Sequence, residues 1–116
     1  MTRTRLTIGV AVAGLALAAS ALAAPTASTV TVTAGKPSEL KFTLSKTSVP
    51  AGSVTFTVTN KGKSTHDFKI AGKKTAVLRA GKTAKLTVTL KKGKAAYLCT
   101  LPGHAAAGMK GTLTVK

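Results

Sequence analysis

Apolar and polar residues alternate in short runs along most of the chain after residue 27. A period of two is typical of β-strands with one buried face, and no window shows a helical period over three turns. Turn-forming segments that contain Gly or Pro separate the runs. The positions that share one face of each run are Val30 and Val32; Leu40, Phe42 and Leu44; Val54, Phe56 and Val58; His66, Phe68 and Ile70; Ala84, Leu86, Val88 and Leu90; Tyr97 and Cys99; Leu113 and Val115. This pattern predicts one all-β domain, a sandwich or barrel of about seven to eight strands.

The N-terminal segment has the features of a secretory signal peptide. Two arginines lie in the first five residues, an uncharged run of 19 residues follows, and Ala21-Leu22-Ala23 is a small-x-small cleavage site. The run also has the length of an uncleaved membrane anchor, for which roughly 18 apolar residues suffice. Its Ala-rich composition is weakly hydrophobic and no positive cluster closes its far end, which favours cleavage. We therefore expect a signal peptide at 1–23, one domain at 24–116, and export to the periplasm, cell envelope or medium.

Composition narrows the possible functions. The 116 residues include 18 Lys and Arg but only two acids, which gives a formal charge of +16, and 44 % are apolar, too many for a disordered chain. A single cysteine excludes an internal disulfide framework and any multi-cysteine zinc or iron–sulfur site. Two histidines and two acids are too few for most acid–base active sites. A small binding or carrier domain is therefore favoured.

The candidate chemistry lies near the C-terminus, where Cys99, His104 and Met109 follow one another at intervals of five residues. The other histidine, His66, lies 33 residues upstream of the cysteine. Two histidines and a cysteine with a weak axial methionine form the blue-copper arrangement, and the thioether argues against zinc. We expect Cys99 at a strand end, a Pro-Gly turn that returns His104 toward the same metal, and Met109 at the entry to the next strand.

Each of these residues alone has a more ordinary interpretation. A lone cysteine is most often a small buried hydrophobe, a lone histidine a hydrogen-bonded core residue, and a methionine a core filler. In a secreted chain, however, an unpaired thiol is a liability unless it is used. All four in this order and spacing favour copper.

At these residues the sequence resembles the cupredoxins, the family of plastocyanin, azurin and rusticyanin. The loop Cys99-x4-His104-x4-Met109 has the spacing of rusticyanin, and the resemblance extends through the upstream histidine and the strand pattern over nearly all of 24–116. The resemblance implies a Greek-key β-sandwich with one type 1 copper near one end. It also implies outer-sphere electron transfer, with His104 as the usual exit.

Two further residues belong to the expected surroundings of the metal. Many cupredoxins carry Asn or Ser after the first histidine ligand, whereas this chain has Asp67. Its carboxylate is expected to accept a backbone N–H near Thr100 and so to brace the cysteine loop, and a strand-end cap is an equal alternative. An acid at this position also adds negative charge near the metal.

Lysines are scattered over the predicted turns and outer strand faces. They either form a solubilising surface that protects strand edges or steer the protein toward acidic partners. The aromatic residues fall on inward positions and are not interleaved with basic ones, which argues against nucleic acid. We expect a monomer with acidic redox partner proteins, and an anionic envelope or membrane surface as a further candidate partner.

Two classes of function remain. The first is an exported carrier that moves single electrons by cycling between Cu(I) and Cu(II). The second is a copper-binding or copper-delivery protein of the cell envelope. A delivery protein is expected to hold copper more openly, often with extra Met or His in a mobile tail, and this chain has only Met1 besides Met109. An enzyme is the least favoured class, because a complete ligand set leaves no open position for substrate.

Overall fold

The computed structural model describes residues 27–116, and the predicted signal peptide lies outside the described residues. Within this range the regular secondary structure consists of β-strands, which confirms the all-β prediction. No helix in the described residues is long and apolar enough to cross a membrane. The strands are β1 (Ala27–Ala34), β2 (Phe42–Leu44), β3 (Ser48–Val49), β4 (Gly52–Asn60), β5 (Lys69–Ile70), β6 (Lys73–Lys74), β7 (Thr83–Leu90), β8 (Gly93–Leu98) and β9 (Lys110–Val115).

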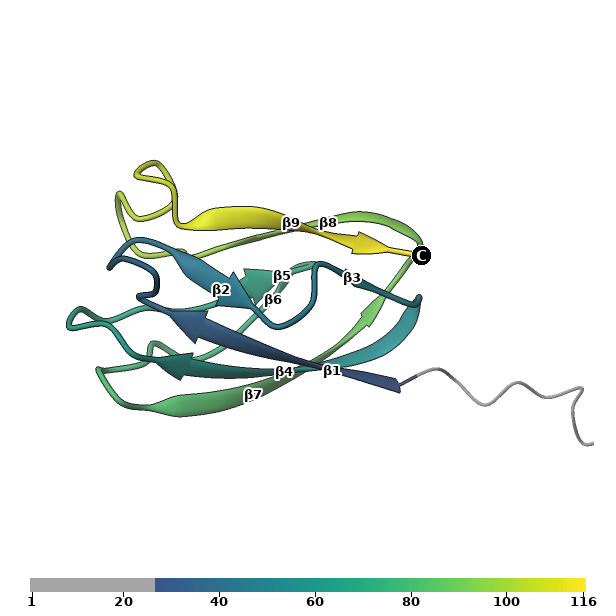
Figure 1. The fold of residues 1–116 in the computed structure, drawn as a ribbon, viewed down its shortest axis with the longest axis horizontal. Helices are drawn as coiled ribbons and strands as arrows, with labels where there is room; N and C mark the ends of the chain where they lie inside the picture. Colours follow the sequence, from purple (N-terminus) through teal and green to yellow (C-terminus); the bar gives the residue numbers. More distant parts are fainter. Residues whose placement is uncertain (1–26) are drawn as a thin grey trace, which may run out of the picture.

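The strands form two sheets packed as a sandwich (Figure 1). One sheet has the order β2-β1-β4-β7 and the other the order β3-β9-β8-β5-β6. β1 pairs with β4 in parallel, as β3 does with β9, and the other pairs are antiparallel. Because β2, β3 and β4 follow one another in the chain but alternate between the sheets, the connections cross from layer to layer. The two layers therefore enclose one core.

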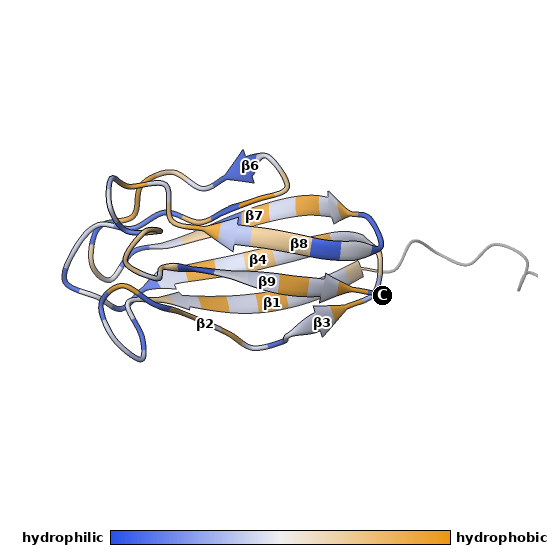
Figure 2. Cartoon of the chain, turned by 90° about the horizontal axis from the view of Figure 1, so that it is seen from above, coloured by the Kyte–Doolittle hydropathy of each residue, from blue (hydrophilic) through white to orange (hydrophobic). Residues whose placement is uncertain are grey.

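Strand alternation fills the space between the sheets. In β4 the side chains of Val54, Phe56 and Val58 are fully buried, while the threonines between them are partly exposed. Figure 2 shows the same alternation as orange hydrophobic bands separated by pale bands along the long strands. Burial of each such apolar side chain stabilises the fold by about 1.5–3 kcal/mol. The predicted inward positions of this strand are confirmed.

The strand predicted around His66 is shorter than its alternation indicates. Of the predicted run, only Lys69 and Ile70 form a strand, β5, which pairs with β8. His66 instead forms an isolated antiparallel bridge with Leu78. Three consecutive residues from His66 onward are buried, because Asp67 turns its carboxylate toward the backbone of Thr100 instead of toward solvent. Residues 27–116 form nine strands, more than the expected seven to eight, because strands of two residues such as β3 and β6 are too short to show an alternating pattern.

Parallel pairing of β1 and β4 brings two loops together at one end of the sandwich. The strands end side by side, with Ala34 opposite Asn60, so the loops that follow them leave the sheet at the same edge. Gly35 fixes the contact between these loops. Its φ is +84°, and a Cβ there would lie 2.5 Å from the backbone of Gly62, too close for any side chain. Its N–H also donates a hydrogen bond of 2.9 Å to the carbonyl of Lys41.

Replacement of Gly35 by Ala is therefore expected to destabilise the protein by about 2–4 kcal/mol. Alanine is strained at the left-handed backbone angle, and its Cβ would push the two loops apart. Gly81→Ala is the matched control, because its φ is +81° but nothing lies within 4 Å of the added Cβ. That variant is expected to lose only about 1 kcal/mol. Urea unfolding measures both losses, and equal losses would contradict the close contact.

Candidate metal centre

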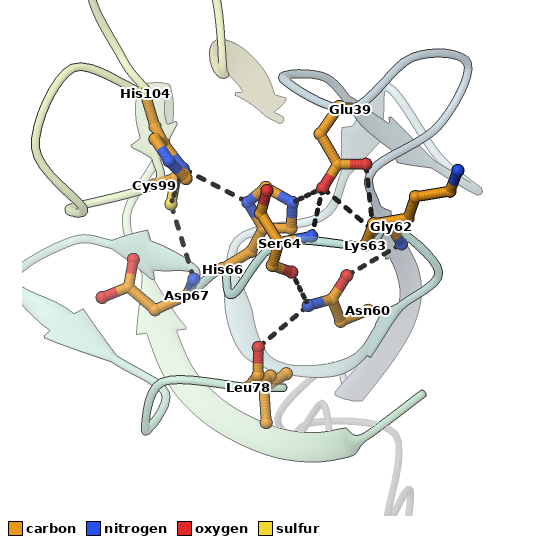
Figure 3. Close-up of polar contacts among 10 residues, drawn as sticks. All are labelled: Glu39, Asn60, Gly62, Lys63, Ser64, His66, Asp67, Leu78, Cys99 and His104. Carbon is orange, nitrogen blue, oxygen red and sulfur yellow. Dashed lines mark hydrogen bonds and ion pairs between the residues drawn. The ribbon is translucent and has the colours of Figure 1, made fainter. Parts of the chain in front are cut away.

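Three of the four predicted donors meet at the loop-bearing end of the sandwich (Figure 3). One ligand atom each from His66, Cys99 and His104 lies within 4.8 Å of the other two. His66 and Cys99 are almost completely buried, at 0 % and 1 % exposure, whereas His104 is partly exposed. The cluster is therefore reached from solvent on the His104 side.

The antiparallel pairing of β5 with β8 aligns the first two donors. Lys69 lies opposite Leu98, so the residues just before β5 run alongside those just after β8. Cys99 directly follows β8, at the strand end where the sequence places it, and His66 lies three residues before β5. Two donors far apart in the chain thus come together through regular strand pairing.

The distances between the donor atoms suit a shared metal. His66 Nδ1 lies 3.3 Å from His104 Nδ1, and His104 Nδ1 lies 3.5 Å from Cys99 Sγ. Nitrogen and sulfur atoms bound at about 2.0–2.3 Å to one metal lie roughly 3.3–3.7 Å apart when the angles are near trigonal. The set of two imidazoles and a thiol is chemically suited to copper.

Met109 lies at the return of the same loop. It is fully buried and belongs to a small apolar cluster with Ala34 and Cys99. Its carbonyl accepts a hydrogen bond of 3.1 Å from the N–H of Cys99, and its own N–H donates one of 3.0 Å to the carbonyl of His104. As predicted, the residue lies immediately before a strand, β9. The backbone therefore closes the loop between cysteine and methionine.

Between these residues the loop is a succession of tight turns. The N–H of His104 donates to the carbonyl of Leu101 at 3.1 Å, and the N–H of Ala107 donates to that of Gly103 at the same distance. Gly103 has a φ of +79°, so the predicted Pro-Gly turn is present. These bonds hold the His104 ring close to the cysteine.

Asp67 joins the two sides of the site. Its buried carboxylate accepts a hydrogen bond of 2.6 Å from the N–H of Thr100 and another from the hydroxyl of the same residue. In the other direction, the N–H of Asp67 donates to Cys99 Sγ at 3.5 Å. The aspartate thus holds the strand ends together and also supplies a donor to the sulfur.

Burial raises the pKa of the Cys99 thiol, and the nearby negative charge of Asp67 acts in the same direction. The backbone N–H of Asp67 opposes this increase by donating to the sulfur. A buried thiolate costs free energy unless a positive charge lies beside it. The pocket is therefore matched to a cation that binds the thiolate.

Glu39 is one of two residues at the site that the sequence analysis missed. Its Oε1 lies 3.0 Å from His66 Nε2 and accepts a 2.6 Å hydrogen bond from the N–H of Ser64. Backbone hydrogen bonds from Lys63 and Ser64 hold the pKa of this carboxyl down at about 2. The one available sequence signal was the rarity of acids, since Glu39 is one of only two in the chain.

Asn60 secures the loop that carries His66. Its side-chain amide is fully buried and donates to the carbonyls of Ser64 and Leu78, both at 2.8 Å. Its side-chain oxygen accepts from the N–H of Gly62 at 2.9 Å. The sequence analysis treated this segment only as a turn, yet the amide fixes both ends of the loop around the histidine (Figure 3).

The sequence model of the cupredoxin-like domain family matches residues 5–115. Auracyanin-B of Chloroflexus aurantiacus is 55 % identical over 42 residues, which are 35 % of this chain and 18 % of that protein. The matched segment thus spans less than a fifth of the relative's length.

Solved structures of two other proteins share the fold. Auracyanin B superposes with a TM-score of 0.68 and 28 % identity, covering 82 % of this chain and 92 % of its own. Rusticyanin from Thiobacillus ferrooxidans superposes with a TM-score of 0.69 and 24 % identity, covering 80 % of this chain and 79 % of its own. Since the family match extends over nearly the whole chain and the donor cluster suits one type 1 copper, the protein belongs to the cupredoxin family of blue copper proteins.

Proposed function

We propose that this protein is an exported single-electron carrier in which His66, Cys99 and His104 would hold copper, with Met109 as a weaker fourth ligand. The observation that supports this assignment most directly is the convergence of the two ring nitrogens and the sulfur within 4.8 Å. Membership of the cupredoxin family supports electron transfer in general. The signal-peptide features of residues 1–23 support export.

When bound, copper supplies the one-electron change between Cu(I) and Cu(II). The chain's own residues hold the donors in place before the metal arrives. Asp67 fixes the cysteine strand end, and the turns of the loop fix His104. A donor set that moves little between the two oxidation states keeps the reorganisation cost of electron transfer small.

His104 is the proposed exit for the electron. It is the partly exposed member of the cluster, whereas the other proposed ligands are buried. Small or apolar residues surround it in the loop: Leu101, Pro102, Ala105, Ala106 and Ala107. A smooth, weakly polar surface of this kind lets a redox partner approach the imidazole without a large desolvation cost.

Burial of the proposed ligands favours an electron carrier over the alternative function, copper delivery. Transfer of copper to another protein requires the acceptor's ligands to reach the metal, yet His66, Cys99 and Met109 are at most 1 % exposed. The same enclosure and the full set of donors leave no open coordination position for a substrate. We therefore propose a carrier with no enzymatic activity.

The ligand assignment predicts an intense visible absorption band from thiolate-to-copper charge transfer. Cys99→Ser is expected to abolish this band, because the serine hydroxyl cannot supply a thiolate. Met109→Leu is the matched control from the same loop and is expected to keep the band, since a thioether would bind copper only weakly and the side chains are similar in volume. Absorption spectra of the Cu(II)-loaded proteins measure both effects. A Cys99→Ser variant that stays coloured would refute the assignment.

Asp67 is proposed to brace the cysteine strand end. Asp67→Ala is expected to destabilise the metal-free protein by about 1–3 kcal/mol, because it removes the charged acceptor of the hydrogen bond from the N–H of Thr100. Asp67→Asn keeps a side-chain acceptor and is expected to lose less. Urea unfolding compares the two, and equal losses would show that the hydrogen bond does not carry the effect.

The basic surface predicts an acidic redox partner. Removal of residues 1–23 would leave a formal charge of +14. Electron exchange with an acidic redox protein is then expected to slow as salt rises, because the Debye length is about 10 Å at 0.1 M and shorter above it. Stopped-flow rates across an ionic-strength series measure this, with an uncharged small-molecule reductant as control. A flat or rising rate with the acidic protein would leave the lysines with a role in solubility alone.

A further inference from the structure

Both acids of the chain, Glu39 and Asp67, lie at the metal centre, although the rest of the sequence is strongly basic. Asp67 contacts the cysteine side of the site. Glu39 comes from the loop between β1 and β2 and contacts the opposite side, at His66. The side chain of Glu39 is 37 % exposed, while that of His66 is fully buried. The carboxylate thus covers the buried ring from the solvent side.

The contact determines which ring nitrogen is available to a metal. His66 Nδ1 faces His104 at 3.3 Å, inside the donor cluster, and Nε2 faces Glu39 Oε1 at 3.0 Å. A carboxylate only accepts hydrogen bonds, so the proton of the neutral ring lies on Nε2. The lone pair is then on Nδ1 and points into the cluster.

Glu39 is itself held in place by the loop that carries His66. Its oxygens accept hydrogen bonds from the N–H of Lys63 at 3.0 Å and from the N–H of Ser64 at 2.6 Å. The carboxylate, the two N–H groups and the imidazole therefore form a closed set of contacts. Rotation of the ring breaks this set, so the orientation of the ring is fixed without a metal.

We propose that Glu39 is a positioning residue that holds His66 in the metal-binding tautomer and biases the bound copper toward Cu(II). This inference rests on the proposed function, since it takes His66 as a ligand. A carboxylate bonded to the outer nitrogen of a ligand imidazole raises the basicity of the ring. Because Glu39 carries a full negative charge, it stabilises the more positive oxidation state more than a neutral acceptor would.

Three variants distinguish the positioning role of Glu39 from the effect of its charge. Glu39→Gln keeps an oxygen acceptor for Nε2–H but removes the charge, whereas Glu39→Leu removes both. Thr89→Lys, at an exposed position of β7, changes the net charge by the same amount away from the metal centre and serves as the control. Each is compared with the wild-type chain.

The first measurement uses metal-free protein and reads the tautomer by ¹⁵N NMR of the histidine rings. The wild type and Glu39→Gln are expected to show the proton of His66 on Nε2, while Glu39→Leu shows a mixture of tautomers. A Glu39→Leu variant that keeps a pure Nε2–H form would overturn the positioning role.

The second measurement is the reduction potential of the copper-loaded proteins by voltammetry. Glu39→Gln is expected to weaken Cu(II) relative to Cu(I) by at least tenfold, which raises the potential by 59 mV or more for a one-electron couple. Thr89→Lys is expected to shift it much less. Equal shifts in Glu39→Gln and Thr89→Lys, or no shift in Glu39→Gln, would overturn the bias.

The two proposals fail in different ways. If wild-type protein with Cu(II) shows no thiolate-to-copper band, the ligand assignment itself is wrong. If Glu39→Gln keeps that band but leaves the potential unchanged, the ligand assignment stands and the charge effect of Glu39 is refuted.

Discussion

The antiparallel pairing of β5 with β8 is the contact on which the metal centre depends. It carries His66 and Asp67 alongside Cys99 and Thr100, and the short hydrogen bonds between the aspartate and the threonine continue the alignment past the last ladder pair. The chain between these segments is about thirty residues long, and closure of a loop of that length costs only a few kcal/mol of entropy. The strands that flank the segments recover this cost by burying apolar side chains in the core. His66 and Cys99 are therefore placed by the pairing of the strands next to them.

The apolar core continues directly beneath the site. Phe42 packs against both the main core and the small cluster that contains Cys99 and Met109. Its ring meets Phe68 edge to face at 5.4 Å and Tyr97 at 5.9 Å, contacts that are each worth about 0.5–1.5 kcal/mol beyond burial. Since packed interiors resist deformation, the cysteine and methionine sit on a rigid base. A rigid donor set is what a carrier needs, because each ångström of ligand movement adds to the barrier for electron transfer.

The sequence predicted those parts of the molecule that depend on local pattern. The period-two runs located the long strands, as in β4, and the spacing of Cys99, His104 and Met109 pointed to one metal. Some contacts between residues distant in the sequence were missed. Glu39 bonds to a residue 27 positions away and sits in a loop without any period. The segment at His66 was assigned as a strand because it alternates, yet its contacts with the site override the alternation.

The placement of the two acids has a consequence for the balance of charges at the metal. The exposed lysines lie in water, where salt screens their effect beyond about 10 Å. The Glu39 carboxylate instead contacts the ring of His66 directly, and the Asp67 carboxylate lies near enough to Cys99 to raise the pKa of its thiol. Charges in contact with the donor residues outweigh distant charges in solvent. In the proposed carrier, the surface charge therefore governs how partners approach, and the proposed contact of Glu39 with His66 biases the oxidation state of the site. The basic surface and the potential of the site can then vary independently, since different residues determine each of them.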